Sequence, residues 1–509
     1  MKKTLIPRSR IRRNRTQERG VTMLLVAVAM VAIIGMAALS IDVITLYLAR
    51  EEAQHSADSA ALGAAKVLSL SGITGDPANV SGNWGHICGP DNGTNGLATR
   101  VAKAIATQNA VGGAVPTTIN VTYSAGSASS TAGTSDCTSL NGTAFGINPV
   151  VTVQIIRTGV PNFFSRVWGN AGTSLSATAS AEAFNSSNSA SVGTSGNIIP
   201  VQPLCVKPWA VPNQDPLFPI PSSPTGPFCN QPGQLSCSPF VDLLTGTIQH
   251  PGISTGGTST NGVIGETFWL APDCFHGNPS YCKLLTNGVG ADVQPQANFN
   301  DGSGFIKGPP NFPNLLSAPS LVGSPVLAIP SCSTGDAYED AIEGCDAPTN
   351  YRCGVPNQNT IDLTKHNPGV NSMTSAVQCL IHQTDATNLT GSSGQDYLNT
   401  FAAPSAYPFQ ILAGSSNPIG PSLSGSPISN SSSIVSLPIY DQTAATLTGN
   451  STTPVTFIGF LQVFINAVDV NGNRSVTVLN VTGCGNGSNP TGTPVTGSSP
   501  VPVRLITPP

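Results

Sequence analysis

Residues Val21 to Ile41 form an apolar run without a single charged side chain. A helix of this length crosses a hydrocarbon core of about 30 Å, so the run predicts a transmembrane helix over residues 21–41. Residues 1–20 form a basic arm, in which eight lysines and arginines face one acid, Glu18. Because positively charged segments stay in the cytoplasm, we expect a cytoplasmic N-terminus and an exported C-terminal body.

A cleaved signal peptide is the alternative interpretation of this segment. Ala38-Leu39-Ser40 supplies the small residues of a cleavage site. The apolar part of a signal peptide is shorter, at about 7 to 15 residues, and this difference favours the transmembrane helix.

Helical periodicity continues beyond the apolar run. Residues spaced three or four apart form one apolar stripe, and polar side chains such as Arg50 and Glu51 lie on the other side, as in an amphipathic helix. Nothing in the sequence stops this helix before about Ser71-Gly72, since alanine has the highest helix propensity. The members of the stripe are Leu46, Ala49, Ala53, Ala57, Ala60, Ala64 and Leu68.

Asp42 comes directly after the apolar run, and we expect it at the far interface, where its charge stays hydrated while the helix continues. The alanine stripe is either the core face of the first exported domain or a surface for another helix, because small residues permit close approach. The candidate interaction residues, at the membrane exit and on the packing face, are Asp42, Tyr47, Ala53, Ala57, Asp58, Ala60, Ala61 and Ala64.

The predicted fold class is α+β: a single N-terminal transmembrane helix that extends into an α+β exported module over residues 42–184, followed by a β-rich exported region. The module contains a second amphipathic helix and three segments with the two-residue period of strands. The helix is expected at Leu97–Gln108, and the strands at Thr117–Tyr123, Val150–Ile156 and Ser174–Phe184. Residues 185–197, rich in Ser, Asn and Gly, predict a linker.

Residues 198–484 predict a β-rich, disulfide-containing exported domain with many Pro and Gly turns and no convincing long helix. The strongest hairpin signal is Asn471-Gly472, which separates two strand-like runs. Residues 485–509 are rich in Pro, Gly, Ser and Thr, and this composition predicts a disordered tail.

All 12 cysteines lie in the body that is predicted to be exported. An even number of cysteines in an exported chain favours disulfides in an oxidising compartment. Three pairs share the spacing C-x7-C, and local bridges within them are our preferred pairing, although spacing alone leaves the connectivity open. These pairs are Cys229 with Cys237, Cys274 with Cys282, and Cys345 with Cys353.

One stretch, Gly252-Ile253-Ser254-Thr255-Gly256, matches the nucleophile turn G-x-S-x-G of hydrolases. That turn needs a strand before it and a helix after it. Here Pro251 precedes the match and a Gly- and Thr-rich stretch follows it, so we interpret the stretch as a loop and expect no enzymatic activity.

Patterns for metals, cofactors and nucleic acids are equally weak. Cys274, His276 and Cys282 lack the spacing of a zinc site. Two Asp- and Gly-containing segments, 301–304 and 469–473, lack the downstream glutamate of a calcium loop, and the second is explained as a hairpin turn. The acidic run 336–346 is interpreted as a solvated face. Since the basic residues concentrate in the N-terminal arm, a nucleic-acid partner is not expected either, and no cofactor is predicted.

Residues 19–68 include R-G-V-T-M-L-L-V-A-V-A-M and A-A-L-S-I-D-V-I-T-L-Y-L-A-R-E-E-A-Q-H-S-A-D-S-A-A-L-G-A-A. This segment resembles the N-terminus of TadG-like proteins of the Flp (tight adherence) pilus-assembly system. Such segments combine an Arg-Gly entry, an aspartate at the outer end of the membrane helix, a tyrosine, and an alanine-rich run. The matching positions are Gly20, Asp42, Tyr47, Ala57, Asp58, Ala60, Ala61, Leu62, Ala64 and Ala65.

Two departures limit what the resemblance implies. Leu25 stands where cleavable pilin-like members carry a glutamate, so processing at Gly20 by a prepilin peptidase is not expected. The D-x-S-x-S metal motif of larger members with a von Willebrand A domain is also missing from the sequence, so metal-dependent adhesion is not implied.

The resemblance implies a non-enzymatic, membrane-anchored component of Flp-type pilus assembly or anchoring. It would lie in a bacterial inner membrane with its C-terminal body in the periplasm. Its expected partners are the lipid bilayer and other pilus-assembly membrane proteins or pseudopilins. A secreted or surface adhesin with a cleaved N-terminal signal is the alternative, and an exported hydrolase that uses Ser254 is a third hypothesis.

Overall fold

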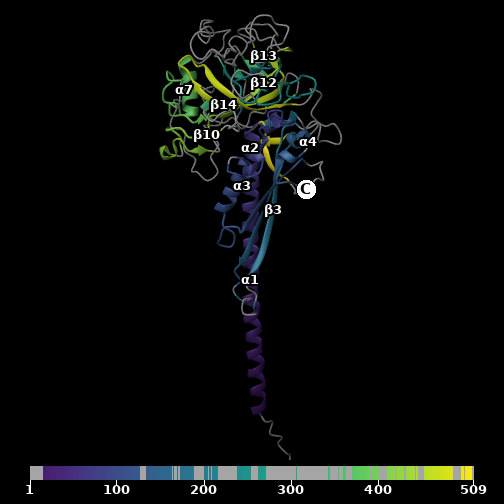
Figure 1. Ribbon diagram of the computed structural model, residues 1–509. Helices are drawn as coiled ribbons and strands as arrows, with labels where there is room; N and C mark the ends of the chain where they lie inside the picture. The colour runs from purple at the N-terminus through teal and green to yellow at the C-terminus, as the bar shows by residue number, and fades with distance from the viewer. Residues whose placement is uncertain are drawn as a thin grey trace, which may run out of the picture. The chain divides into compact units, whose positions relative to one another are not determined.

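The structure of the protein is a computed structural model (Figure 1). The residues that the structure describes are 15–93, 95–126, 133–140, 142–162, 164, 169, 172–187, 200–203, 206–207, 209–215, 238–253, 262–270, 305–306, 342–343, 353–354, 359–362, 370–389, 393–399, 410–418, 420–428, 431–441, 443–444, 452–484, 495–497 and 499–506. A long apolar N-terminal helix is followed by a sheet-rich region with several helices, which confirms the predicted α+β class.

Helix α1 runs without a break from Arg15 to Leu70, as Figure 1 shows. It therefore begins before the predicted start at Val21 and ends directly before the predicted stop at Ser71-Gly72. The helix stops where Gly72 adopts a φ of 66°, a left-handed conformation that a residue with a side chain adopts only at a cost. At about 1.5 Å per residue, α1 is roughly 84 Å long.

The chain divides into two compact units. Unit 1 contains residues up to 57 together with 106–119 and 154–177, and unit 2 contains residues 58–105, 120–153 and 178–509. Unit 2 contains residues from both sides of the predicted linker at 185–197. Buried hydrogen bonds join the two sides within unit 2: the side chain of Asn185 donates to the carbonyl of Val481 over 3.0 Å.

The first sheet has the strand order β1-β2-β3-β17. Strands β1 (Thr118–Ser124), β2 (Val150–Val160) and β3 (Thr173–Ala183) confirm the three predicted strands within a few residues. Helix α3 (Leu97–Gln108) has the predicted bounds. These segments were predictable because their apolar period is regular and local.

Strand β17 (Val503–Ile506) corrects the expectation of a disordered tail over 485–509. It pairs antiparallel with β3, so that Val503 lies opposite Ala183 and Ile506 opposite Ser180. A second short strand of the tail, β16 (Val495–Gly497), pairs parallel with β4 (Val201–Pro203). Strand pairing is provided by the backbone, so a segment of low-complexity composition can still be ordered by a sheet edge.

The second sheet lies in unit 2 and has the order β5-β12-β14-β15-β6. Its central hairpin, β14–β15, confirms the predicted Asn471-Gly472 turn, in which Gly472 has a φ of 76°. The Asp469 carboxylate accepts the backbone N–H groups of Asn471 and Asn473, each over 2.8 Å, which explains this segment as a turn. The strands are β5 (Val211–Pro212), β12 (Ile434–Tyr440), β14 (Phe457–Val468), β15 (Arg474–Gly483) and β6 (Thr267–Leu270).

Helix α7 (Val370–Ile381) corrects the expectation of no long helix after residue 198. Ala376, Val377, Leu380 and Ile381 are buried on one face of it. The other short elements are η1 (Ile73–Gly75), α2 (Trp84–Cys88), η2 (Cys137–Ser139), α4 (Gly142–Ile147), β7 (Phe305–Ile306), β8 (Asn359–Asp362), β9 (Tyr397–Leu398), β10 (Ile411–Leu412), η6 (Pro421–Leu423), β11 (Pro427–Ile428) and β13 (Thr452–Val455).

Two disulfides are described, Cys88–Cys137 and Cys353–Cys484. The second is a correction, since Cys353 was expected to pair with Cys345 and instead bonds to a cysteine that lies 131 positions away. In the core, Cys353 and Cys484 pack with the buried Phe457 and Phe460 of β14. The other two C-x7-C pairs, Ser254, His276, segment 301–304 and most of the acidic run lie outside the described residues.

Candidate functional site: the N-terminal helix and the hairpin packed on it

The first half of α1 presents an apolar surface that is exposed. Met23 is 80% exposed, Val31 72% and Leu39 61%, and the neighbouring large apolar side chains are similarly uncovered. α1 is the one helix of the described chain that is long and apolar enough to cross a membrane. Exposure of such a surface to water is unfavourable in free energy, so the surface indicates contact with lipid or with another apolar surface.

Asp42 departs from the expectation that its carboxylate stays hydrated. Its side chain is only 4% exposed. Both carboxylate oxygens accept the backbone N–H of Phe164, over 3.2 and 3.1 Å. Because a buried carboxylate is costly without hydrogen-bond donors, this N–H stabilises the aspartate at the end of the apolar run. Sequence analysis missed this pairing, since the two residues are 122 positions apart.

Phe164 lies in the connection between β2 and β3, which form an antiparallel hairpin. The hydroxyls of Thr152 and Ser180 meet across the pair over 2.8 Å, and nearer the connection Gly172 comes against Gly159. At the connection, the side-chain amide of Asn162 donates to the Thr173 hydroxyl over 3.1 Å. We call the described residues 160–162, 164, 169 and 172–173 the hairpin end.

A second connection, between α3 and β1, also contacts α1 in unit 1. The backbone N–H of Gly112 donates to the Glu52 carboxylate over 2.7 Å. Gly112 has a φ of 58° and lies so close to the helix that an added Cβ would be 3.7 Å from the Cβ of Ala49. The left-handed φ favours glycine here, and the 3.7 Å separation places this connection in van der Waals contact with the helix.

The predicted packing face is buried by the chain itself. Ser56, between two of its alanines, donates to the carbonyl of Ala106 at the end of α3 over 3.5 Å. In unit 2, the two helices approach closely at Gly63, where an added Cβ would lie 2.2 Å from the Cδ1 atom of Ile105. The fully buried alanines are Ala53, Ala57, Ala60, Ala61, Ala64 and Ala65. In this structure the face is a core surface, one of the two alternatives left open by the sequence.

Tyr47 and Asp58 do not share the buried position of these alanines. Tyr47 is 63% exposed, and Asp58 is partly exposed. The predicted interaction residues thus separate into a buried face and an exposed face of one helix.

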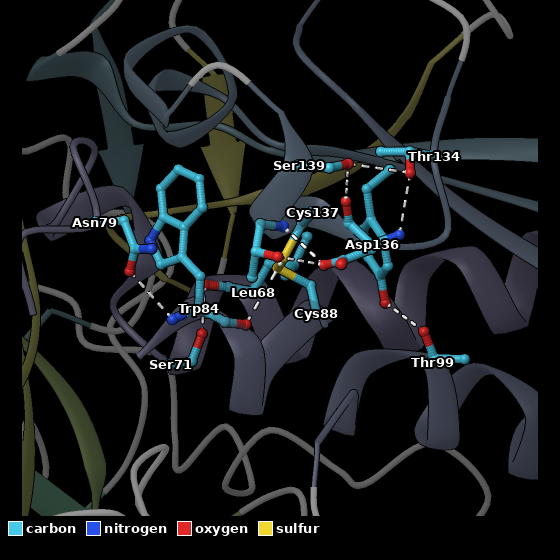
Figure 2. Close-up of a disulfide and its surroundings, with 12 residues drawn as sticks. Leu68, Ser71, Asn79, Trp84, Cys88, Thr99, Thr134, Asp136, Cys137 and Ser139 are labelled. Atoms are coloured by element: carbon cyan, nitrogen blue, oxygen red, sulfur yellow. Dashed lines mark hydrogen bonds between the residues drawn. A yellow bond between two sulfur atoms is a disulfide. The ribbon is translucent and has the colours of Figure 1, made fainter. Parts of the chain in front are cut away.

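In unit 2, the end of α1 adjoins a small aromatic core beside the Cys88–Cys137 disulfide (Figure 2). The rings of Trp84 and Phe145 meet edge to face with their centroids 5.2 Å apart. Asn79, at a φ of 52°, accepts the backbone N–H of Trp84 and so fixes the start of α2. Because the bridge joins segments 49 positions apart, it stabilises a loop-rich region with few regular elements.

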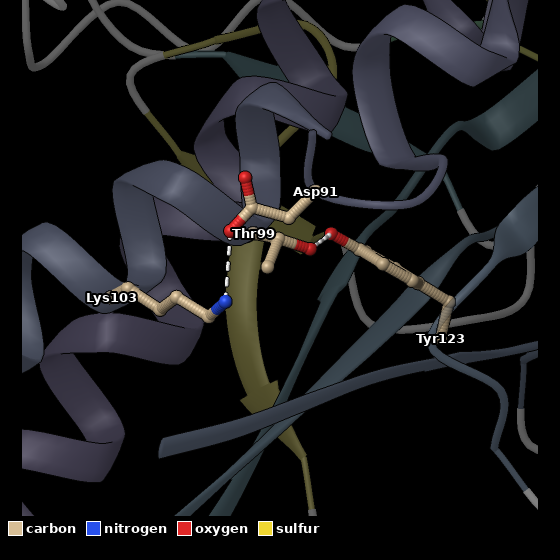
Figure 3. Close-up of polar contacts among 4 residues, drawn as sticks. All are labelled: Asp91, Thr99, Lys103 and Tyr123. Atoms are coloured by element: carbon tan, nitrogen blue, oxygen red, sulfur yellow. Dashed lines mark hydrogen bonds and ion pairs between the residues drawn. The ribbon is translucent and has the colours of Figure 1, made fainter. Parts of the chain in front are cut away.

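Polar contacts attach α3 to its neighbours in the same unit (Figure 3). The hydroxyls of Thr99 and Tyr123 are 2.7 Å apart, and burial raises the pKa of the Tyr123 phenol, which therefore stays protonated. The Lys103 ammonium donates to the Asp91 carboxylate over 2.8 Å and lowers the pKa of that carboxyl. The first pair joins α3 to β1, and the second joins α3 to the segment before it. Both are ordinary structural contacts.

Within the described part of the chain, no group of three or more His, Cys, Asp and Glu side chains could hold a metal ion. The main features of the site are the exposed apolar first half of α1 and the body that packs on the second half of α1. They define a class of proteins in which one N-terminal helix is apolar over its first half and is a core element of an α+β body over its second half.

Residues 20–67 match the family described as "Putative Flp pilus-assembly TadE/G-like". The resemblance predicted from residues 19–68 is thus confirmed for the N-terminal segment. No curated protein and no solved structure matches the chain.

Proposed function

We propose that this chain is a non-enzymatic, membrane-anchored component that assists the assembly or anchoring of a Flp-type pilus. The observation that carries the proposal is the change in the surroundings of α1 along its length. Nearly all of its large apolar side chains are exposed up to Leu48, and its alanines are fully buried from Ala53 onward. A helix of this kind is suited to hold a folded body against a bilayer. The match to a pilus-assembly family over the same residues supports the pathway.

The proposed location is a bacterial inner membrane, with the N-terminus in the cytoplasm and the body in the periplasm. The basic arm before Val21 supports this orientation through the positive-inside tendency. The Cys88–Cys137 and Cys353–Cys484 disulfides support export of the body, since such bonds persist in oxidising compartments. Other pilus-assembly membrane proteins or pseudopilins are the proposed partners.

Membrane anchoring is tested by fractionation of cells that produce the full chain, with carbonate washing of the membrane pellet. Val31 and Ile34 are both exposed in the apolar half, so the double substitution Val31→Arg/Ile34→Arg should release protein into the soluble fraction. Each arginine near the centre of a span costs about 2.5 to 3.5 kcal/mol on insertion scales. His55→Arg, on the exposed side of α1 beyond the apolar half, is the matched control and should stay in the pellet.

The intact mass of the purified protein distinguishes an anchor from a cleaved leader. A mature chain that starts near Ile41 would sink the anchor and favour a secreted adhesin. Orientation is tested by adding protease to spheroplasts, which should digest the body and spare residues 1–20.

The pilus role is tested by deletion of the protein and inspection of the cells for pili. The full chain should restore pili, and the Val31→Arg/Ile34→Arg variant should not. Restoration by that variant at equal abundance would separate the pilus role from the anchor.

A further inference from the structure

The exposed apolar surface of α1 does not end at Asp42. Four side chains beyond it are exposed and apolar: Val43 57%, Ile44 57%, Tyr47 63% and Leu48 52%. We call these four residues the distal apolar face. The first charged residues after it are Arg50 and Glu51.

The length of the whole exposed segment fits more than the hydrocarbon core. From Val21 to Leu48, α1 is about 42 Å long at roughly 1.5 Å per residue. A bilayer that includes both headgroup layers is about 40 to 45 Å thick. If α1 spans the membrane, as the proposed function requires, the distal apolar face lies in the outer headgroup layer. Asp42, about 9 Å before Leu48, then lies at the edge of the hydrocarbon.

The depth of Asp42 in the bilayer explains why its carboxylate is buried and hydrogen-bonded. A carboxylate at the edge of the hydrocarbon is stable only with hydrogen-bond donors, and the Phe164 N–H is one of them. Since that hydrogen bond fixes Phe164 beside Asp42, the hairpin end lies at the same depth. Phe164 is 38% exposed there.

The two sides of α1 at this level have different surroundings in unit 1. Ala38, Asp42 and Ala49 are buried, whereas the distal apolar face is bare. The bare side continues the exposed apolar surface of residues 21–41 without a change in character, and it stops where charged residues begin. It also contains Tyr47, and tyrosine is enriched at membrane interfaces. Continuity with the membrane-spanning part favours lipid over a protein partner as the occupant.

We propose that the distal apolar face and the Phe164 ring are immersed in the outer headgroup layer, so that the hairpin end is an interfacial anchor for the exported body. This inference rests on the membrane anchoring proposed above and extends it. Asp42 is then the residue that holds the hairpin end at the bilayer surface, and the membrane boundary lies near Arg50.

The test is depth-dependent quenching of a fluorescent amino acid, incorporated singly into the full chain in phospholipid vesicles. Val31, Tyr47, Phe164 and His55 are the labelled positions. Nitroxides on lipid headgroups and at shallow acyl positions should quench Tyr47 and Phe164 several-fold more than His55, and a deep nitroxide should quench Val31. If Val31 is quenched and Tyr47 and Phe164 behave like His55, the interfacial anchor is wrong and the transmembrane anchor stands. If Val31 is not quenched either, both proposals fail.

Substitution of Asp42 tests the link to the hairpin end. Asp42→Ala should reduce quenching at Phe164 and leave quenching at Tyr47 unchanged. Asp42→Asn retains an acceptor oxygen for the Phe164 N–H and should preserve both signals, so it is the matched control. Unchanged quenching at Phe164 in Asp42→Ala would overturn the role assigned to Asp42.

A photo-crosslinking amino acid at Tyr47 identifies the occupant of the distal apolar face directly. In the same vesicles and in cells, the main adduct should be phospholipid. A dominant protein adduct, with another chain or with a second copy, would overturn the assignment of this face to lipid.

Discussion

The side-chain amide of Asn480 in β15 donates a hydrogen bond to the backbone carbonyl of Ser69 in the last turn of α1, over 2.8 Å. Asn480 also contacts the Thr74 hydroxyl, and Thr74 accepts a hydrogen bond from Asn185 over 3.0 Å. All four residues are buried. In unit 2, the end of the N-terminal helix is thus joined to the C-terminal hairpin by a buried amide network, in which the loss of a donor is costly.

Asn480→Leu should therefore destabilise unit 2 by about 1 to 3 kcal/mol, because the Ser69 carbonyl is left buried without this donor. Urea unfolding of the detergent-solubilised protein measures the change. Asn399→Leu removes an exposed amide contact with Gln410 and is the control, with an expected effect within about 0.5 kcal/mol. Equal effects of the two substitutions would contradict the importance of the network.

The Cys88–Cys137 bridge should contribute a larger share of stability. Its loss in the double variant Cys88→Ser/Cys137→Ser removes a loop constraint of 49 residues, worth about 4 kcal/mol in the chain-entropy model. Urea unfolding under oxidising conditions is the measurement. Ser139→Ala, at an exposed hydroxyl near the bridge, should change stability little. A double variant as stable as the native chain would show that the bridge is dispensable.

The regular part of this fold was predictable from sequence because its signals are local. The apolar run, the alanine stripe, α3 and the Asn471-Gly472 hairpin each carry their period within one segment. Helix α7 was missed because V-N-S-M-T-S-A-V-Q-C-L-I contains many residues of low helix propensity. The packing of its buried face, which includes Val377 and Leu380, overrides that propensity.

The features that could not be predicted from the sequence depend on contacts between residues far apart in the chain. Strand β17 exists because β3 offers it an edge, and Cys353 finds Cys484 rather than its near neighbour. The candidate site shows the same limit: Asp42 was identified as a special position, but its partner Phe164 and its burial follow from a tertiary contact.

Stability should fall as the solution becomes acidic, through His382. Burial lowers the pKa of this histidine, and the nearby Asp396 opposes that shift only partly. With its ordinary pKa of about 6.5, His382 in the unfolded chain binds a proton at a higher pH than in the folded chain. Its contribution is therefore fully present above pH of about 6.5 and is lost as the pH falls below it.

Urea midpoints between neutral and mildly acidic pH test this dependence. His382→Asn should flatten it, and asparagine tolerates the left-handed backbone at this position, where φ is 61°. The pKa of His250 is also lowered by burial, so His250→Asn should flatten the remaining slope. An unchanged slope in the double variant would show that other groups control the acid sensitivity.

The close approach of α1 and α3 at Gly63 should make this position intolerant of large side chains. Even an added Cβ would lie 2.2 Å from the Cδ1 atom of Ile105 and 3.6 Å from Cγ1 of Val101. Gly63→Leu should therefore destabilise unit 2 by about 1 to 3 kcal/mol through overpacking, as measured by urea unfolding. Ile105→Ala creates space beside Gly63, so the double variant should lose less stability than the sum of the single variants.

Gly35→Leu is the matched control on the same helix, since no atom lies within 4 Å of a Cβ there, and it should leave the stability of the body unchanged. Additive losses at Gly63 and Ile105 would mean that the two helices do not meet at this point.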